Sequence, residues 1–125
     1  EIGNTYDNAV LYTDYFLQKV ISLLKDNASR FETAMVYMSD HGESLGEYGI
    51  YLHGLPYAMA PDSQKHIASV LWFGDSFKID RKAVRQKANQ YFSHDNLFHT
   101  MLGLMEIETS IYTKELDILH DCKIQ

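Results

Sequence analysis

Residues 32–54 read ETAMVYMSDHGESLGEYGIYLHG, and this stretch decides the fold. Its first seven residues, Glu32–Met38, are rich in apolar and β-favouring side chains, and polar Ser39 and Asp40 follow at once. This pattern predicts a buried strand that ends at Met38. In α/β sheets, ligands bind beyond the carboxyl ends of the strands, so we expect a functional site in the segment that follows.

An amphipathic helix is predicted over Tyr6–Asp26, because apolar residues recur there at a helical spacing with polar residues opposite. The apolar positions are Val10, Leu17, Val20, Ile21 and Leu24. Asn4 or Thr5 can supply the N-terminal cap. A second buried strand is predicted at His66–Phe73, closed by Gly74. The loop between the two strands is long and punctuated by glycine and proline, which is typical of functional loops.

The C-terminal part predicts two further helices. Asp80 caps a helix that runs to about Phe92, and Ser93 caps a second. The expected inward residues are Val84, Ala88 and Tyr91 in the first helix, and Leu97, Phe98, Met101, Leu102 and Met105 in the second. From Ile107 the sequence is polar and irregular. One weak apolar patch follows, made of Leu116, Ile118 and Leu119.

The predicted order of helix, strand, loop, strand and helix is typical of the α/β class. Buried strands such as AMVYM fit a sheet that is covered on both faces. Two strands are too few for a stable sheet of this class. We therefore expect these 125 residues to be part of a larger α/β domain.

The composition excludes some classes of function. The formal net charge is −6 and the 11 Lys and Arg residues are scattered, whereas nucleic-acid binders need clustered basic residues. We therefore expect no nucleic-acid partner. No apolar run approaches the roughly 18–20 residues of a membrane span, and no charged-then-apolar leader opens the chain, so we expect no membrane segment within it.

Asp40 and His41 are candidate zinc ligands at the end of the first predicted strand. A carboxylate oxygen and an imidazole nitrogen both bind zinc, and a catalytic zinc typically takes three protein ligands and keeps one position open. Gly42 permits the bend that lets two adjacent residues face one ion. His53, 12 positions after His41 (53 − 41), can return from the loop to the same region. The alternative is an ordinary turn with a solvated Asp-His pair, and the spacing alone leaves both interpretations open.

The same stretch contains a rival motif. Residues Gly42–Gly46, GESLG, match the G-x-S-x-G nucleophile elbow of the α/β-hydrolases. The elbow requires its serine on a sharp turn directly from strand to helix. Asp40 and His41 intervene in this chain, and the residues after Gly46 have no helical period. We therefore expect Ser44 to be a local cap or a hydroxyl that bonds the loop backbone.

The remaining histidines and the single cysteine lack the setting of a site. Each of these histidines is expected on the surface or in a packing contact; they are His66, His94, His99 and His120. His94 follows the predicted cap Ser93, and a buried place near the site is a second interpretation for it. Cys122 is either a free thiol or half of a bridge to another segment, and an inert free thiol is the commoner case.

Several segments together resemble one known family. SDHGESLGE at residues 39–47 and YLHG at residues 51–54 closely resemble the C-terminal catalytic segment of the phosphoethanolamine transferases that modify lipid A. These enzymes are members of the alkaline phosphatase/sulfatase superfamily. YDNAVLYTDYFL, SHDNLFHTMLGL and LDILHDC also look like that family, so the resemblance covers nearly the whole chain. It implies an α/β, sulfatase-like fold with a central mixed sheet and helices on both faces, of which residues 1–125 are the C-terminal portion of a single catalytic domain.

The resemblance also implies an activity and its partners. The whole enzyme would move phosphoethanolamine from phosphatidylethanolamine to a lipid A phosphate, with zinc as cofactor, at the periplasmic face of the bacterial inner membrane. This activity is linked to polymyxin resistance in the family. The membrane region and the N-terminal half of the catalytic domain would lie outside this chain, and the latter would be its partner. The alternatives are a different hydrolase or phosphoglycerol transferase of the superfamily, using calcium or manganese, and a non-catalytic fragment or module.

Residue roles follow from the same resemblance. Asp40 and His41 match two zinc ligands, and His53 matches the histidine near the transferred group or a second zinc, so it is expected to bind substrate and to act in catalysis. The family's glutamate ligand, threonine nucleophile and further histidine lie upstream, and this chain contains no nucleophile. Glu43 is expected either to hydrogen-bond a ligand residue or to be a solvated loop acid. An oxidising periplasm favours a bridge from Cys122 to an upstream cysteine.

Overall fold

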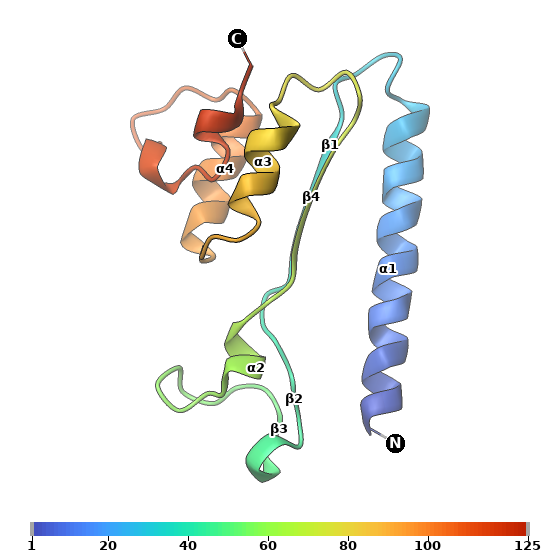
Figure 1. Cartoon of the computed structure of the whole chain (residues 1–125), viewed down its shortest axis with the longest axis vertical. Coiled ribbons are helices and arrows are strands. Elements are labelled where there is room, and N and C mark those ends of the chain that lie inside the picture. The colour runs from blue at the N-terminus through green and yellow to red at the C-terminus, as the bar shows by residue number, and fades with distance from the viewer. Residues whose placement is uncertain (1, 125) are drawn as a thin grey trace. The chain divides into compact units, whose positions relative to one another are not determined.

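The computed structural model describes residues 2–124, and the chain divides between Phe77 and Lys78 into two units. The first unit holds one long helix, two small antiparallel sheets and a short helix, and the second holds two helices and two 3-10 turns. Figure 1 shows these elements coloured along the chain. Among the described residues, no helix combines the length and the apolar character that crossing a membrane requires.

The first helix, α1, spans Ile2–Asp26 and ends where the sequence predicted. It begins earlier than expected, so Asn4 and Thr5 lie inside the helix and the predicted cap is wrong. The reason is visible in the sequence, because Ile2 extends the apolar recurrence by four residues before Tyr6.

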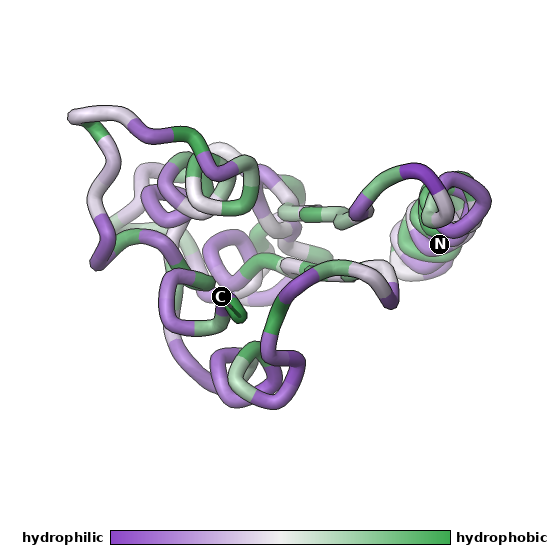
Figure 2. The backbone as a smooth tube through the Cα atoms, turned by 90° about the horizontal axis from the view of Figure 1, so that it is seen from above, coloured by the Kyte–Doolittle hydropathy of each residue, from purple (hydrophilic) through white to green (hydrophobic). Residues whose placement is uncertain are grey.

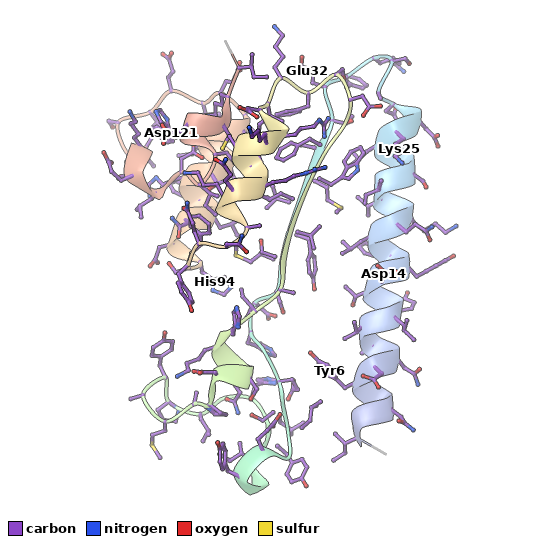
Figure 3. All side chains as sticks on the ribbon, in the orientation of Figure 1. Tyr6, Asp14, Lys25, Glu32, His94 and Asp121 are labelled. Atoms are coloured by element: carbon purple, nitrogen blue, oxygen red, sulfur yellow. The ribbon has the colours of Figure 1, made fainter. Side chains whose placement is uncertain are left out.

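The predicted inner face of α1 is only half-buried in this chain. No residue of α1 is buried; the half-buried apolar residues are Leu17, Val20, Ile21 and Leu24. Val10 is 50% exposed, which differs from the prediction. Figure 2 shows hydrophobic and hydrophilic residues alternating around this helix, and Figure 3 shows side chains, including the labelled Tyr6, Asp14 and Lys25, projecting from it. An apolar stripe of this kind normally packs against another element.

The two predicted strands are confirmed and pair with each other. β1, Ala34–Met38, and β4, Ser69–Phe73, run antiparallel with Ala34 opposite Phe73 and Met38 opposite Ser69. Met35 and Phe73 are buried in the core of this unit, at 7% and 6% exposure. Most of the other strand residues are half-buried or exposed, contrary to the expected burial on both faces. A sheet of only two strands has few neighbouring elements to cover it. The described residues therefore do not bury both faces of the sheet, although the apolar sequence of the strands predicted this.

The long loop between β1 and β4 contains small elements that the sequence did not predict. β2, Ser44–Leu45, pairs antiparallel with β3, Tyr51–Leu52, across the 3-10 turn η1, Glu47–Gly49. The short helix α2, Asp62–Lys65, follows and lies beside this ribbon in Figure 1. The loop is therefore folded back on itself.

In the second unit, the helix α3 spans Arg81–Lys87 and is capped as predicted. The carboxylate of Asp80 accepts hydrogen bonds from the backbone N–H groups of Lys82 and Ala83 at 2.9 and 3.1 Å. The predicted extension to Phe92 is wrong. Tyr91 was expected on the inner face, but it is 98% exposed, so no packing surface holds the chain in a helix beyond Lys87.

The second helix of this unit, α4, spans Asp95–Leu104. Its N-cap is His94, one residue after the predicted cap Ser93. Ser93 still contacts the first turn, because its hydroxyl accepts from the N–H of Asp95 at 3.2 Å and its own N–H donates to Oδ1 of Asn96 at 2.9 Å. Leu102 is buried, whereas Phe98 and Met105 are more than half exposed, contrary to expectation.

The 3-10 turns η2, Lys114–Leu116, and η3, His120–Cys122, complete the second unit. The weak apolar patch predicted in this region contributes Leu119, whose exposure is 0%. The buried hydrophobic residues of this unit are Ile79, Leu102, Leu119 and Cys122.

Candidate metal and transfer site

The β2–β3 ribbon places Glu43 opposite His53. Ser44 pairs with Leu52 in the antiparallel register, so the residues that flank this pair, Glu43 and His53, lie across the ribbon from each other. Nδ1 of His53 is 3.1 Å from Oε2 of Glu43. The ribbon therefore explains how residues ten positions apart meet.

The same ribbon brings His53 to His41. Their imidazole rings are stacked, with centroids 3.8 Å apart and an interplanar angle of 29°. The sequence predicted that His53 returns to the region of the Asp-His pair, and the structure places it there. The roles assigned to these residues remain predictions.

Asp40 and His41 present two suitable metal-binding atoms. Nδ1 of His41 is 2.9 Å from the carbonyl oxygen of Gly42 and donates to it, so Nε2 carries the lone pair. This Nε2 lies 3.8 Å from Oδ2 of Asp40, whose side chain is 89% exposed. A backbone carbonyl that holds the distal ring nitrogen is the usual arrangement around a metal-binding histidine.

The donor atoms of Asp40 and His41 fit a zinc ion with a small adjustment. Ligand atoms on a tetrahedral zinc are roughly 3.3 Å apart, given bond lengths of about 2.0 Å. The observed 3.8 Å separation is a few tenths of an ångström wider, and the other oxygen of the exposed Asp40 carboxylate, Oδ1, accepts from the backbone N–H of His41 at 3.1 Å. Two ligands are fewer than a zinc site needs, so this pair would be part of a larger set.

A second group of potential ligands overlaps the first. His41, Glu43 and His53 each offer one donor atom, and these atoms lie within 4.8 Å of one another. That limit is well above the roughly 3.3 Å expected around one tetrahedral ion, and Nδ1 of His53 already bonds Glu43. The loop thus offers two overlapping groups of donor atoms, Asp40 with His41, and His41 with Glu43 and His53.

Gly42 allows its backbone to pack closely against the backbone of Ser63, and it does not provide the bend that the sequence predicted. Its φ is not in the left-handed region, where the structure places Gly46, Gly49 and Gly54. A Cβ at Gly42 would collide with the carbonyl oxygen of Ser63, and the Gly42 N–H donates to the carbonyl of Gln64 at 3.0 Å. The expected reason for this glycine is thus corrected: it lets the loop lie directly against α2.

Ser44 is a structural residue in a strand. The residue is 1% exposed, and its hydroxyl accepts from Nε2 of Gln64 at 2.9 Å and lies 3.2 Å from the hydroxyl of Ser63. The expectation that it bonds backbone is wrong, because its partners are side chains. It lies on β2 and not on a strand-to-helix turn, so the nucleophile elbow does not form.

The other histidines occupy surface or packing positions. His66 and His94 are exposed, so the interpretation of His94 as a buried residue is wrong. Nδ1 of His99 accepts from the N–H of Thr113 at 3.0 Å, and Nδ1 of His120 lies 3.1 Å from the hydroxyl of Tyr112. These contacts support local structure, as the sequence predicted.

A buried polar cluster around Asp117 was missed at the sequence level. Asp117 accepts from the hydroxyl of Tyr112 at 2.8 Å and from Nζ of Lys123 at 3.3 Å, and its side chain has no exposure. Burial, and then the hydrogen bond to Asp117, raise the pKa of Tyr112 to about 12. No spacing in the irregular segment after Ile107 indicates this cluster.

The thiol of Cys122 is buried and unbridged among the described residues. Burial raises the pKa of this thiol, which makes it a poor nucleophile. The bridge to an upstream cysteine remains a prediction.

Known proteins share both the sequence and the fold of this chain. The sulfatase family model matches residues 1–107. The chain belongs to the sulfatase family. It is 49% identical over 128 aligned residues to phosphoethanolamine transferase EptA of Escherichia coli K12, an alignment that covers 98% of this chain and 23% of that protein.

Two solved structures from Neisseria meningitidis match this sulfatase-family chain. The soluble domain of lipooligosaccharide phosphoethanolamine transferase A superposes with a TM-score of 0.92 at 48% identity, covering 99% of this chain and 39% of that one. The integral membrane form of the same transferase gives a TM-score of 0.91 at 49% identity, covering 98% and 24%. These matches confirm the predicted resemblance and the mixed α/β, sulfatase-like fold class. The chain spans less than a quarter of the length of the curated relative.

Proposed function

We propose that this chain is the C-terminal part of the single catalytic domain of a zinc-dependent transferase. The enzyme moves phosphoethanolamine from phosphatidylethanolamine to a lipid A phosphate at the periplasmic face of the bacterial inner membrane. The membrane region, the threonine nucleophile and the N-terminal half of the domain lie outside these residues. The support is the near-complete match to proteins named phosphoethanolamine transferases, combined with the Asp40–His41 pair.

Asp40 and His41 hold the zinc ion in this proposal. Oδ2 of Asp40 and Nε2 of His41 are the ligand atoms, because the His41 Nδ1 is committed to the carbonyl of Gly42. When bound, zinc supplies positive charge that neutralises the transferring phosphoryl group. The remaining ligands come from the upstream part of the domain.

His53 acts on the group that is transferred. Its Nδ1 bonds Glu43, so Nε2 is the ring atom left for a substrate. When this ring is protonated, Nε2–H steadies a phosphate oxygen or donates to the departing diacylglycerol oxygen. The side chain is 49% exposed, which leaves it accessible to a lipid headgroup.

The test is a transfer assay on the intact protein with fluorescent phosphatidylethanolamine as donor and lipid A as acceptor. We expect transfer by the wild type, and a loss of about 10²–10⁴-fold in kcat for His53→Ala. His66→Ala, which replaces an exposed histidine of the same unit, is the matched control and should keep full activity. A wild-type protein that hydrolyses sulfate esters or transfers phosphoglycerol instead would replace the proposal with another superfamily activity.

A further inference from the structure

We propose that Glu43 is a positioning residue that fixes the ring of His53 for the transfer reaction. The inference rests on the proposed function of His53. It goes further in assigning a task to a carboxylate that the sequence left open between a hydrogen-bonding partner and a solvated loop acid.

The contact between the two side chains is set by the backbone. The Ser44–Leu52 pair of the β2–β3 ribbon places Glu43 and His53 at the next cross-strand position. Oε2 of Glu43 accepts from Nδ1 of His53 at 3.1 Å. A carboxylate accepts hydrogen bonds only, so this contact keeps a proton on Nδ1 and leaves Nε2 for the substrate: in the neutral ring Nε2 is an acceptor, and in the protonated ring it carries the Nε2–H that the transfer step uses.

A second contact restrains the same ring from its face. The His41 ring stacks on it with centroids 3.8 Å apart. The hydrogen bond to Glu43 limits rotation of the imidazole in its own plane, and the stack limits its tilt. Together they define both the direction of Nε2 and the plane of the ring, which a reaction at a phosphoryl group requires.

The burial of Glu43 argues against a solvated loop acid. Its side chain is 23% exposed, whereas that of Asp40, three residues earlier, is 89% exposed. Oε1 of Glu43 is buried and has no hydrogen-bond partner among residues 2–124. Removing a carboxylate oxygen from water without a hydrogen-bond partner is unfavourable. The fold of the loop, and not contact with solvent, therefore keeps the Glu43 side chain in this position.

Glu43 as a metal ligand is the competing explanation, because His41, Glu43 and His53 offer donor atoms within 4.8 Å of one another. The two roles respond differently to an amide. A glutamine at this position can still accept from Nδ1–H of His53 through its carbonyl oxygen, but an amide is a poor zinc ligand.

The experiment compares Glu43→Ala, Glu43→Gln and the control Glu47→Gln in the intact protein. Glu47 is an exposed acid of the same ribbon that accepts from the N–H of Leu45. The measurements are kcat and KM with fluorescent phosphatidylethanolamine and lipid A, zinc content by elemental analysis, and the ring tautomer of His53 by ¹⁵N NMR of histidine-labelled protein.

We expect Glu43→Ala to lower kcat by about 10–100-fold with KM and zinc content near the wild type, and to show a mixture of His53 tautomers. Glu43→Gln should restore most of kcat and the Nδ1–H tautomer, and Glu47→Gln should match the wild type. Unchanged kcat and tautomer in Glu43→Ala would overturn the proposal, and so would loss of zinc in Glu43→Gln. If the wild type transfers no phosphoethanolamine, the proposed function fails, while the tautomer comparison still decides whether Glu43 positions the ring.

Discussion

The imidazole rings of His41 and His53 are stacked with their centroids 3.8 Å apart, although 12 positions separate the two residues in the chain (53 − 41). One ring belongs to the proposed metal pair and the other to the proposed transfer step. A metal-bound group at His41 and a phosphoryl contact at His53 would therefore be neighbours. The ribbon of β2 and β3 creates this proximity, so changes that loosen the ribbon should impair both functions together.

Substituting Gly42 tests how the ribbon is anchored. The Cβ of Gly42→Ala would collide with the backbone carbonyl of Ser63, which cannot move aside as a side chain can. We expect the free energy of unfolding of the intact protein to fall by about 1–3 kcal/mol in a urea titration.

Gly3→Ala is the matched control for this substitution. A Cβ at Gly3 meets nothing within 4 Å, and Gly3 lies in α1, where alanine is the better helix former. This variant should be unchanged or more stable by up to about 1 kcal/mol. Equal stability of the Gly42→Ala protein and the wild type would show that the fold of the loop does not require the close packing of Gly42 against the carbonyl of Ser63.

Ser44 should not react as a nucleophile. Ser44 is 1% exposed and its hydroxyl accepts from Nε2 of Gln64, so the hydroxyl is neither accessible nor next to a general base. We expect no labelling of the intact protein by a fluorophosphonate probe, under conditions in which a serine esterase is fully labelled. A covalent adduct mapped to Ser44 by mass spectrometry would favour the hydrolase interpretation over the zinc account.

The Tyr112–Asp117 contact predicts a loss of stability at high pH. The folded-state pKa of Tyr112 is raised to about 12, from an unfolded value near 10. Because the pKa is raised on folding, neutral Tyr112 makes its full contribution to the free energy of unfolding below about pH 10. This contribution is lost as the pH rises towards about 12. The urea midpoint of the intact protein should fall over this window more steeply than that of Tyr112→Phe.

Tyr91→Phe is the control for this pH series, because Tyr91 is 98% exposed. Its urea midpoints should follow the slope of the wild type. Identical slopes for the wild type and Tyr112→Phe would mean that the phenol of Tyr112 does not titrate differently in the folded and unfolded states.

The sequence was sufficient where a strong local pattern coincided with packing. β1 and β4 were predictable because Val36 and Leu71 lie in short apolar runs that polar or glycine residues close. The cap at Asp80 was predictable because a short side chain at that position satisfies the first N–H groups of α3. The failed extension of α3 shows the limit, because Tyr91 fits the helical spacing but finds no surface to pack against.

The sequence singled out the residues of the candidate site but did not predict their contacts. Asp40 and His41 were identified from their place after a strand, which is a local property. The contacts of His53 with Glu43 and His41 depend on the register of two strands of two residues each, and such short strands carry no readable period. The cluster around Asp117 was not predictable for a similar reason, because it depends on the path of an irregular segment that has no periodic pattern.

The isolated 125-residue chain should be inactive. In the proposal it holds two of the zinc ligands, Asp40 and His41, where a catalytic site needs about three, and the threonine nucleophile is expected upstream. We expect no transfer from fluorescent phosphatidylethanolamine and only weak zinc binding by the isolated chain, with the intact protein as positive control. Zinc-dependent turnover by the isolated chain would show that the site is complete without upstream residues.

The central claim is that Asp40 and His41 hold zinc in the intact enzyme. Elemental analysis of the purified intact protein tests it most directly, with Asp40→Ala and His41→Ala beside the wild type and with His66→Ala as the control at an exposed histidine of the same unit. The account predicts zinc in the wild type and in His66→Ala, and loss of most of it in both ligand variants. Full zinc in either ligand variant, or full occupancy of the wild type by manganese or calcium, would contradict it.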